Sequence, residues 1–350
     1  MERDHRCPRC RIPLKSPVRI GTVAVDPCGR CGGLWFGQGE LARVVKESVG
    51  SVPDGSPFGG KRPDGGLTCP ACDAPLGTYE FVESDGGAFD VDLCQRCGGV
   101  WLDQGELERV QRSRAREVVE ARTGWRGWLF QFLLQVPVEL NLPPLRFPLV
   151  TVALVLANVI GFVILFIPPS PMVVVERFAL YADRVPSAQW LLSLLTHQFL
   201  HGGIVHIALN MYFLYKLGDN VEDALGRGGY ILFYLACGVA GGVAQTLMTP
   251  GSAVPVVGAS GAISGLMAAY ALFYRKARLT WMLIVFQFRL AAPWWVLIWF
   301  GLNVAGYLAK QQGIAWGAHL GGFLTGLALA FVLDRAVLRR NPRVRLLRDL

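Results

Sequence analysis

Apolar residues are distributed unevenly along this chain of 350 residues. Residues 1–123 are polar, whereas residues 148–333 contain several apolar runs that are long enough to cross a membrane. We expect six membrane-spanning helices, at about residues 148–167, 203–217, 230–248, 258–274, 293–309 and 314–333. The pattern therefore predicts a soluble amino-terminal part joined to an all-α polytopic membrane domain of six transmembrane helices.

The soluble part contains an internal repeat. The segment from Cys28 to Leu41 recurs, at an offset of 66 residues, as the segment from Cys94 to Leu107. Short alternating runs ahead of each segment predict strands, and a charged helix is expected to begin near Glu106 and at the equivalent Glu40. Residues 48–66 are rich in Gly, Pro, Ser and Asp, so we expect a flexible linker that uncouples the two copies.

Eight of the nine cysteines form four C-x-x-C pairs. Two such pairs complete a tetrahedral site of four thiolates, which leaves no position open for water and is therefore structural and not catalytic. Disulfides are the alternative, and they require an oxidising compartment. We expect two zinc ions per chain, held by Cys7, Cys10, Cys28 and Cys31 and by Cys69, Cys72, Cys94 and Cys97.

The shared signature C-x-x-C-G-G-x-W-x-x-x-G-E-L resembles that of a zinc-ribbon family known as transcription-factor-type zinc fingers. The resemblance covers both copies. It implies two small ribbons that need their metal to fold, because each copy has too few apolar residues for a core of its own. We expect Trp35 and Trp101 to pack on the cysteine knuckles and not to form an exposed docking surface.

The net charge of +8 is divided unequally along the chain. Residues 1–66 carry +4, residues 67–123 carry −5, and the remainder carries +9, much of it beside the predicted spans. The positive-inside rule then places both termini in the cytoplasm, where reduced thiols favour zinc over disulfides. The basic excess suits lipid headgroups, and no nucleic-acid partner is expected. We expect an integral protein of a prokaryotic plasma membrane.

A few polar residues fall at a similar depth near the outer ends of three predicted spans. His206 and Asn210 lie early in the second span, Ser260 opens the fourth, and His319 lies early in the sixth. The nearest acidic residue, Asp219, is 13 residues past His206, so it lies roughly 20 Å deeper. The pattern favours a Ser–His dyad over a Ser–His–Asp triad. The alternative is that Ser260 is only a small residue for close helix packing.

Several motifs resemble those of the rhomboid intramembrane serine proteases, from the first span to the sixth. They are His197-Gln-Phe-Leu-His201-Gly-Gly-Ile-Val-His206-Ile-Ala-Leu-Asn210, Gly258-Ala-Ser260-Gly261 and Ala318-His319-Leu-Gly-Gly322. The resemblance implies that Ser260 is the nucleophile and His319 the general base. It also implies an oxyanion hole formed by His206, Asn210 and the backbone N–H of Ser260. Ser264 replaces an aromatic residue that often packs on the catalytic histidine, so we expect His319 to be held less firmly.

These patterns predict a serine endopeptidase that cleaves transmembrane protein substrates and needs no cofactor for proteolysis. A catalytically weak or inactive relative that binds membrane clients is the main alternative. A cytoplasmic protein segment is the expected partner of the ribbons. We expect the chain to divide into residues 1–47 (first zinc ribbon), 48–66 (linker), 67–123 (second ribbon with its helix), 124–147 (interfacial segment), 148–335 (rhomboid-like membrane domain) and 336–350 (basic tail).

Overall fold

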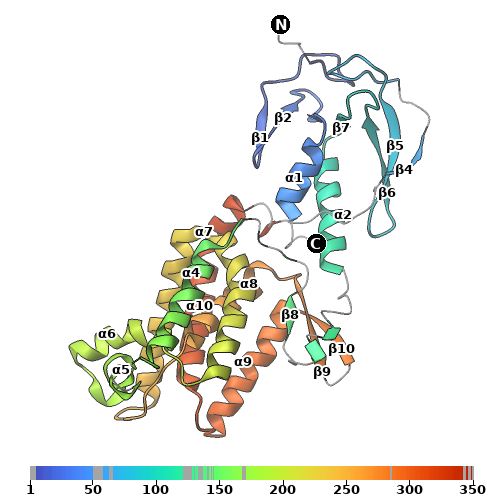
Figure 1. Cartoon of the computed structure of the whole chain (residues 1–350). Coiled ribbons are helices and arrows are strands. Elements are labelled where there is room, and N and C mark those ends of the chain that lie inside the picture. The colour runs from blue at the N-terminus through green and yellow to red at the C-terminus, as the bar shows by residue number, and fades with distance from the viewer. Residues whose placement is uncertain are drawn as a thin grey trace. The chain divides into compact units, whose positions relative to one another are not determined.

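The computed structural model divides into two compact units, which we describe separately (Figure 1). One unit holds residues 1–122 with 141–145 and 349–350, and the other holds residues 123–140 and 146–348. The structure describes the whole chain except residues 1–4, 50–57, 63–65, 121–127, 130, 133–136, 140–141, 143, 145, 168–170, 284–285, 342–343, 346–347 and 349–350.

The first unit is built on one seven-stranded antiparallel sheet, flanked by helices α1 (Glu40–Val49) and α2 (Glu106–Glu120). The strands, in their order across the sheet, are β1 (Val18–Ile20), β2 (Val23–Pro27), β3 (Leu34–Phe36), β7 (Val100–Leu102), β6 (Ala88–Leu93), β5 (Gly77–Val82) and β4 (Phe58–Lys61). At the centre, β3 and β7 pair so that Trp35 lies opposite Trp101. The two sequence repeats therefore complete each other's sheet.

This arrangement differs from the flexible linker expected at residues 48–66. Strand β4 lies inside that interval and pairs with β5, with Phe58 opposite Phe81 and Lys61 opposite Tyr79. The glycine-rich composition suggested a linker, but pairing with β5 gives hydrogen-bond partners to the backbone groups on one edge of β4. Residues 50–57 and 63–65 of the expected linker lie outside the described residues.

A glutamate begins each helix of this unit for a local reason. The Glu40 carboxylate accepts a hydrogen bond from the backbone N–H of Gly37 at 2.8 Å. Glu106 does the same for Asp103 at 2.7 Å. Both side chains reach back to a backbone donor ahead of the helix, as in a capping box, and their negative charge favours the helix N-terminus. Burial raises the pKa of Glu106 to about 7, so its cap lies in a partly desolvated position.

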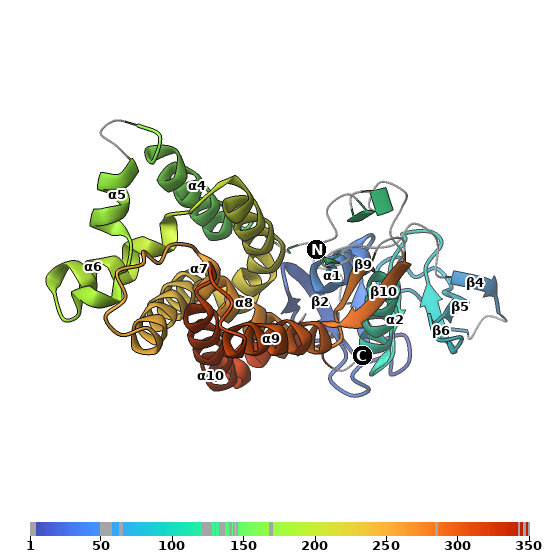
Figure 2. The ribbon, with the colours of Figure 1, turned by 90° about the horizontal axis from the view of Figure 1, so that it is seen from below.

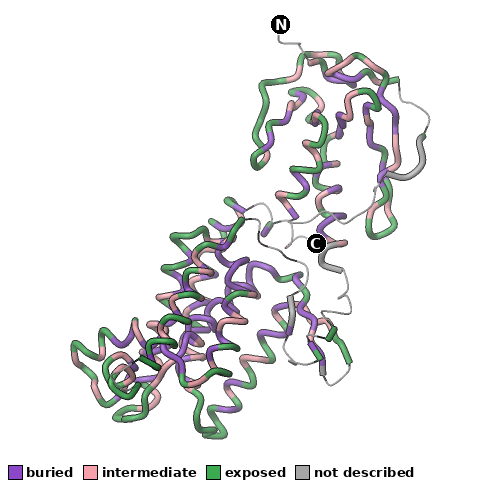
Figure 3. Tube along the Cα trace, in the orientation of Figure 1, coloured by how far each residue is buried: buried purple, intermediate pink, exposed green. Residues whose placement is uncertain are grey.

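The second unit is helical. Its main elements are α4 (Leu149–Ile164), α5 (Pro171–Phe178), η1 (Ala182–Arg184), α6 (Ala188–Thr196), η2 (His197–Phe199), α7 (Ile204–Met248), α8 (Ser260–Phe273), α9 (Ala292–Leu308) and α10 (Trp316–Arg340). Helices α7, α8 and α10 pack together (Figure 2), and α8 is buried along nearly its whole length (Figure 3). The serine-bearing helix is thus the centre of the bundle.

Helix α7 consists of two helices that meet at Gly226. This residue has φ 72° and ψ 160°, a conformation that side chains other than glycine rarely adopt. Within the described residues, α7 and α10 are long and apolar enough to cross a membrane, whereas α4, α8 and α9 are apolar but have 16, 14 and 17 residues. The break at Gly226 separates the expected second and third spans, but the count of six spans stays a prediction.

A small antiparallel sheet, which the apolar pattern did not predict, adjoins α9. It contains β8 (Val138–Glu139), β9 (Arg278–Leu283) and β10 (Phe286–Ala291), in the order β10-β9-β8. Part of the expected interfacial segment at residues 124–147 lies against it, because Gln131 donates to the carbonyl of Thr280 at 2.7 Å and β8 pairs with β9. Trp128 and Phe132 stack on each other and are about two-fifths exposed.

Helices α8 and α10 touch through their backbones. A Cβ atom on Gly322 would lie 2.0 Å from the carbonyl oxygen of Gly261, and one on Gly326 would lie 2.4 Å from the Cα of Gly265. A Cβ on Gly261 would in turn lie 3.2 Å from the carbonyl oxygen of Ala318. Small residues at these positions permit a helix approach that larger side chains would block.

The other end of the bundle is fixed by a carboxylate. Glu222 on α7 accepts hydrogen bonds from the backbone N–H groups of Val150 and Thr151, at 3.1 and 2.8 Å, and from the Thr151 hydroxyl at 2.8 Å. These donors belong to the first turn of α4, whose N–H groups have no partner within the helix. The buried charge therefore anchors α4 to α7 and lies far along α7 from His206.

The glycine contact yields a first prediction. Gly322→Ala should destabilise the helical unit by about 1–3 kcal/mol or more, since the new methyl group meets backbone that cannot move aside. Gly301→Ala on α9 is the matched control, because a Cβ there meets nothing within 4 Å. Thermal unfolding of the full chain in detergent compares the two variants. Equal melting temperatures for both would show that the helices do not need this close approach.

Candidate active site and metal centres

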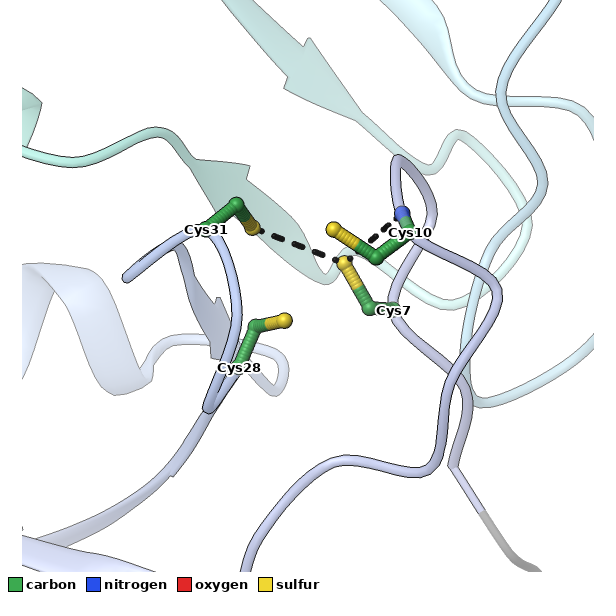
Figure 4. Close-up of side chains that lie close together, drawn as sticks. All are labelled: Cys7, Cys10, Cys28 and Cys31. Carbon is green, nitrogen blue, oxygen red and sulfur yellow. Dashed lines mark hydrogen bonds between the residues drawn. The ribbon is translucent and has the colours of Figure 1, made fainter.

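Each ribbon brings four cysteine sulfurs together. Within each group, the sulfur atoms all lie within 4.8 Å of one another. Figure 4 shows Cys7 and Cys10 on one loop facing Cys28 and Cys31 on another. The Sγ atoms of Cys7 and Cys31 are 3.7 Å apart, and those of Cys69 and Cys97 are 3.6 Å apart. All eight are free thiols, and these distances are far from the roughly 2.05 Å of a disulfide.

These distances fit zinc. Four sulfurs at about 2.3 Å from a central ion occupy a tetrahedron whose edges are about 3.8 Å. Burial raises the pKa of the Cys7 thiol to about 12, so this one thiol favours its neutral form until a bound cation stabilises its thiolate. Each group therefore fits one structural Zn²⁺ ion, and the expected ligand sets are both assembled.

The glycine pair and the tryptophan of the signature connect the two ribbons. A Cβ on Gly33 would lie 2.2 Å from the Trp101 ring, and one on Gly99 would lie 2.3 Å from the Trp35 ring. Both tryptophans are buried, with 3% and 1% of their surface exposed. The prediction that they pack on the knuckles is confirmed, but each one packs on the knuckle of the other ribbon.

An ion pair joins the same two ribbons. The Arg9 Nε atom donates to Asp103 Oδ1 at 2.6 Å, and a second guanidinium nitrogen lies 2.5 Å from Asp103 Oδ2. The same carboxylate accepts a hydrogen bond from the Trp101 indole at 3.0 Å. Bidentate pairs of this kind fix geometry as well as adding energy. The basic first repeat and the acidic second repeat therefore complement each other locally.

This coupling yields a prediction about the metal. We expect a Cys28→Ser, Cys31→Ser double variant to bind one zinc ion in place of two. The remaining ion should also leave at a lower chelator concentration, because β7 loses its partner β3 and Trp101 loses its contact with Gly33.

Elemental analysis and chelator titration of the full chain measure both effects. Cys237→Ser is the control, since this ninth cysteine belongs to neither group and should leave both ions in place. An unchanged affinity for the second ion in the double variant would show that the ribbons fold independently.

Ser260 is the first residue of α8 and is half-buried. The chain enters this helix through Gly258, whose φ is +127°. A Cβ at Gly258 would lie 2.8 Å from His206 Nε2 and 3.7 Å from Ser260 Oγ. The absence of a side chain at Gly258 therefore leaves the space that His206 and Ser260 share.

His206 and Asn210 lie one turn apart on α7. The backbone N–H of Gly202 donates to His206 Nδ1 at 3.4 Å, which favours the tautomer with its proton on Nε2, the atom nearest Gly258. Asn210 is buried, and its amide donates to the carbonyl of His206 at 2.9 Å. One of its two amide hydrogens is thereby used. The hydrogen-bond donors expected near Ser260 thus include at least the His206 Nε2–H group.

His319 lies in the first turn of α10 and is half-buried. Its Nδ1 atom is 2.7 Å from Oδ1 of Asn303 on α9. The ring also lies beside Trp299, at a centroid distance of 5.9 Å, and beside Trp316 at 6.1 Å in an edge-on arrangement. The expectation that His319 is held loosely is therefore wrong, because α9 and α10 supply the aromatic contacts that Ser264 cannot.

Ser264 has another partner. It is buried, and its hydroxyl donates to the carbonyl of Ser260 at 2.6 Å. Gln245 on α7 accepts a hydrogen bond from the backbone N–H of Ala318 at 3.2 Å, directly before His319. These bonds hold the first turns of the two helices that carry the serine and the histidine.

Among the described residues, no hydrogen bond joins Ser260 directly to His319. The two residues nevertheless begin helices that touch, since Gly261 follows Ser260 and meets the carbonyl oxygen of Ala318, which precedes His319. Catalytic hydrogen bonds are often long before substrate binds, so this geometry is compatible with a nucleophile and its base.

Motif reading missed Asn303, Trp299 and Gln245. The signal for Asn303 was present, because it is a single amide within an apolar helix and buried polar residues in such helices have specific partners. Nothing in the sequence pairs it with His319, since the two residues belong to different helices.

Comparison with known proteins adds an independent finding. Residues 188–336 match a family model described as a rhomboid domain. Residues 6–47 and 68–113 each match a model described as a transcription factor zinc-finger. The first match lies within the helical unit and extends from α6 into α10, and the other two cover the two ribbons, so the predicted resemblance to both families is confirmed.

Several curated relatives carry rhomboid names. RHOMBOID-like protein 6, mitochondrial, of Arabidopsis thaliana is 31% identical over 48% of this chain and 52% of its own length. Rhomboid protease GluP of Bacillus subtilis is 43% identical over 22% of this chain and 14% of its own. Rhomboid-type serine protease 2 of Emericella nidulans is 30% identical over 48% and 31%. The chain thus spans about half the length of the first relative and less of the other two.

Proposed function

We propose that this chain, which carries a rhomboid domain behind two zinc ribbons, is a serine endopeptidase that cleaves membrane proteins within or near a transmembrane segment. One observation carries the proposal. The helices that begin with Ser260 and bear His319 touch through Gly261 and Ala318, and His206 lies beside the same serine. A nucleophile, a candidate base and a hydrogen-bond donor thus converge from α8, α10 and α7.

The proposed reaction proceeds through an acyl-enzyme. Ser260 Oγ attacks the carbonyl carbon of the scissile peptide bond while His319 accepts the hydroxyl proton. The negative charge that develops on the carbonyl oxygen is stabilised by the His206 Nε2–H group, the Asn210 amide and the N–H of Ser260. His319 then protonates the leaving amine, and a water molecule hydrolyses the ester by the same steps in reverse order.

The proposed topology has six membrane spans and two cytoplasmic termini. The two halves of α7, together with α4, α8, α9 and α10, would supply these spans. Ser260, His319 and His206 would then lie near the outer face, and the basic residues after α8 and α10 would lie at the inner face. A substrate helix must unwind locally to expose a peptide bond, so helix-breaking residues near the cut should favour cleavage.

A catalytically inactive relative that binds membrane clients is the second candidate. Such a protein needs the same bundle but not the Ser260 hydroxyl or the His319 ring. The bonds from Gln245 to the start of α10 and from Ser264 to the start of α8 favour catalysis, because they fix the helix ends that bear these two groups. Binding a membrane client does not require the Ser260 hydroxyl and the His319 ring to be held in fixed positions.

For the ribbons we propose a cytoplasmic protein-binding role. The charge balance of +4 and −5 offers no sustained basic surface for phosphates. Arg9 is already engaged by Asp103, which further reduces the basic character of the first repeat. A cytoplasmic tail of the substrate is the proposed ligand, since binding it would raise the local concentration of substrate at the protease.

The dyad is tested by single substitutions in the full chain. Ser260→Ala or His319→Ala should abolish cleavage of a transmembrane substrate while the protein stays folded. Asn210→Ala should retain weak activity, about a hundred- to a thousandfold below wild type, because other donors to the oxyanion remain. Cleavage is measured by the release of soluble fragments from reconstituted vesicles. Cleavage by Ser260→Ala at the wild-type rate would reject the dyad, whereas no cleavage by the wild-type protein would favour the inactive relative and its client-binding role.

The role of the ribbons is tested by deleting residues 1–123. We expect cleavage of a minimal transmembrane substrate in detergent to persist, and cleavage of a full-length substrate with its cytoplasmic tail to fall. Rates on the two substrates are compared in parallel. An equal loss on both would show that the ribbons support folding of the membrane unit, and tight, salt-sensitive binding of duplex DNA by residues 1–123 would contradict the protein-binding role.

A further inference from the structure

Asn303 is a buried amide in an apolar helix. Only 4% of its surface is exposed, and its neighbours along α9 are mostly apolar or aromatic. Burying an amide without hydrogen bonds is costly, so its partners reveal what it does. They are the carbonyl oxygen of Trp299, to which its Nδ2 donates at 2.8 Å, and His319 Nδ1, which lies 2.7 Å from its Oδ1.

These two contacts determine which way the amide faces. In the observed orientation the amide nitrogen meets a carbonyl oxygen and the amide oxygen meets a ring nitrogen. The flipped orientation would set Asn303 Oδ1 against the carbonyl oxygen of Trp299, and two acceptors cannot share a hydrogen bond. The Trp299 carbonyl therefore fixes the amide with its oxygen towards His319.

An acceptor opposite Nδ1 requires a proton on Nδ1. The neutral imidazole carries one ring proton, so Nε2 is left with its lone pair and is the atom that can accept a proton. In soluble serine proteases a buried aspartate sets this tautomer, and a substitution that favours the wrong tautomer lowers turnover greatly. An amide supplies the same acceptor without the cost of burying a negative charge in an apolar helix.

We propose that Asn303 is a positioning residue that fixes the tautomer and orientation of His319, so that Nε2 serves as the proton acceptor for Ser260. This inference rests on the proposed protease function. It assigns to an amide from α9 the role that a carboxylate fills in a Ser–His–Asp triad. In the described parts of α7, α8, α9 and α10, no Asp or Glu lies in the helix turns that bear His206, Ser260, Asn303 and His319. Trp299 and Trp316 restrain the plane of the His319 ring, while Asn303 determines which ring nitrogen carries the proton.

A merely structural role for Asn303 is the competing explanation, and the chain contains a matched control. Asn158 on α4 is fully buried and donates from Nδ2 to the carbonyl of Leu154 at 2.8 Å, four residues earlier in its helix. Asn303 makes the same bond to Trp299, also four residues earlier. Only Asn303 also contacts His319. A comparison of variants at the two asparagines therefore distinguishes a loss of stability from a loss of catalysis.

The test uses full-length protein in vesicles with a transmembrane substrate. Asn303→Leu should lower kcat by about tenfold to a hundredfold with little change in KM, because the lost hydrogen bond affects the chemical step and not substrate binding. Asn303→Asp keeps an acceptor opposite His319 Nδ1 but loses the amide donor to the Trp299 carbonyl, so it should retain more of the wild-type kcat than Asn303→Leu does. Asn158→Leu should lower the melting temperature and leave kcat per folded molecule unchanged.

The kcat values of these variants show whether Asn303 positions His319. A kcat for Asn303→Leu equal to wild type, or a loss that Asn158→Leu reproduces per folded molecule, would overturn the inference. If Asn303→Leu does not fold, Asn303→Ala and Asn303→Asp decide it, since the inference requires Asp to restore turnover that Ala loses. Failure of wild type to cleave, with Ser260→Ala indistinguishable from it, would instead reject the proposed function itself.

Discussion

The close approach of α8 and α10 is the constraint on which the candidate active site depends. Gly261 and Gly265 on one helix meet Gly322 and Gly326 on the other with no side chains between them. Any larger residue at these positions would push the helices apart and carry Ser260 away from His319. A dyad on two helices needs this precision, because an error of 1 Å in placing a reacting group costs on the order of a hundredfold in rate. Asn303, Gln245 and Ser264 then adjust the two helix ends that the glycines bring together.

The two ribbons also depend on a close approach that glycine permits. The glycine pair of each knuckle has no side chain, and the tryptophan of the other ribbon occupies the space that this leaves. Zinc fixes each knuckle, and the shared sheet joins the two halves around one core that contains both tryptophans. A small module that lacks a sufficient core of its own thus obtains one by pairing with its repeat.

Much of this could be predicted from the sequence where a signal is local. The C-x-x-C spacing identified both ligand sets, and the motifs around Ser260 and His319 indicated the resemblance to a rhomboid domain that comparison confirms. Pairing between distant segments could not be predicted. Three such pairings join residues whose local sequences give no signal that they meet. They are the pairing of β3 with β7, the pairing of the strand Phe58–Lys61 with β5, and the hydrogen bond between Asn303 and His319. The loose histidine expected from Ser264 was wrong for the same reason, because the replacement contacts come from Trp299 and Trp316.

The reactivity of the Ser260 hydroxyl is the most direct consequence of the proposed dyad. Ser260 is activated only if His319 Nε2 can accept its proton, so a serine-directed fluorophosphonate should modify Ser260 and no other serine. Mass spectrometry of the full chain after reaction in membranes measures this. We predict a single adduct on Ser260 that disappears in the His319→Ala variant and persists in Gly301→Ala. An unmodified Ser260, or an adduct that forms equally well without His319, would contradict it.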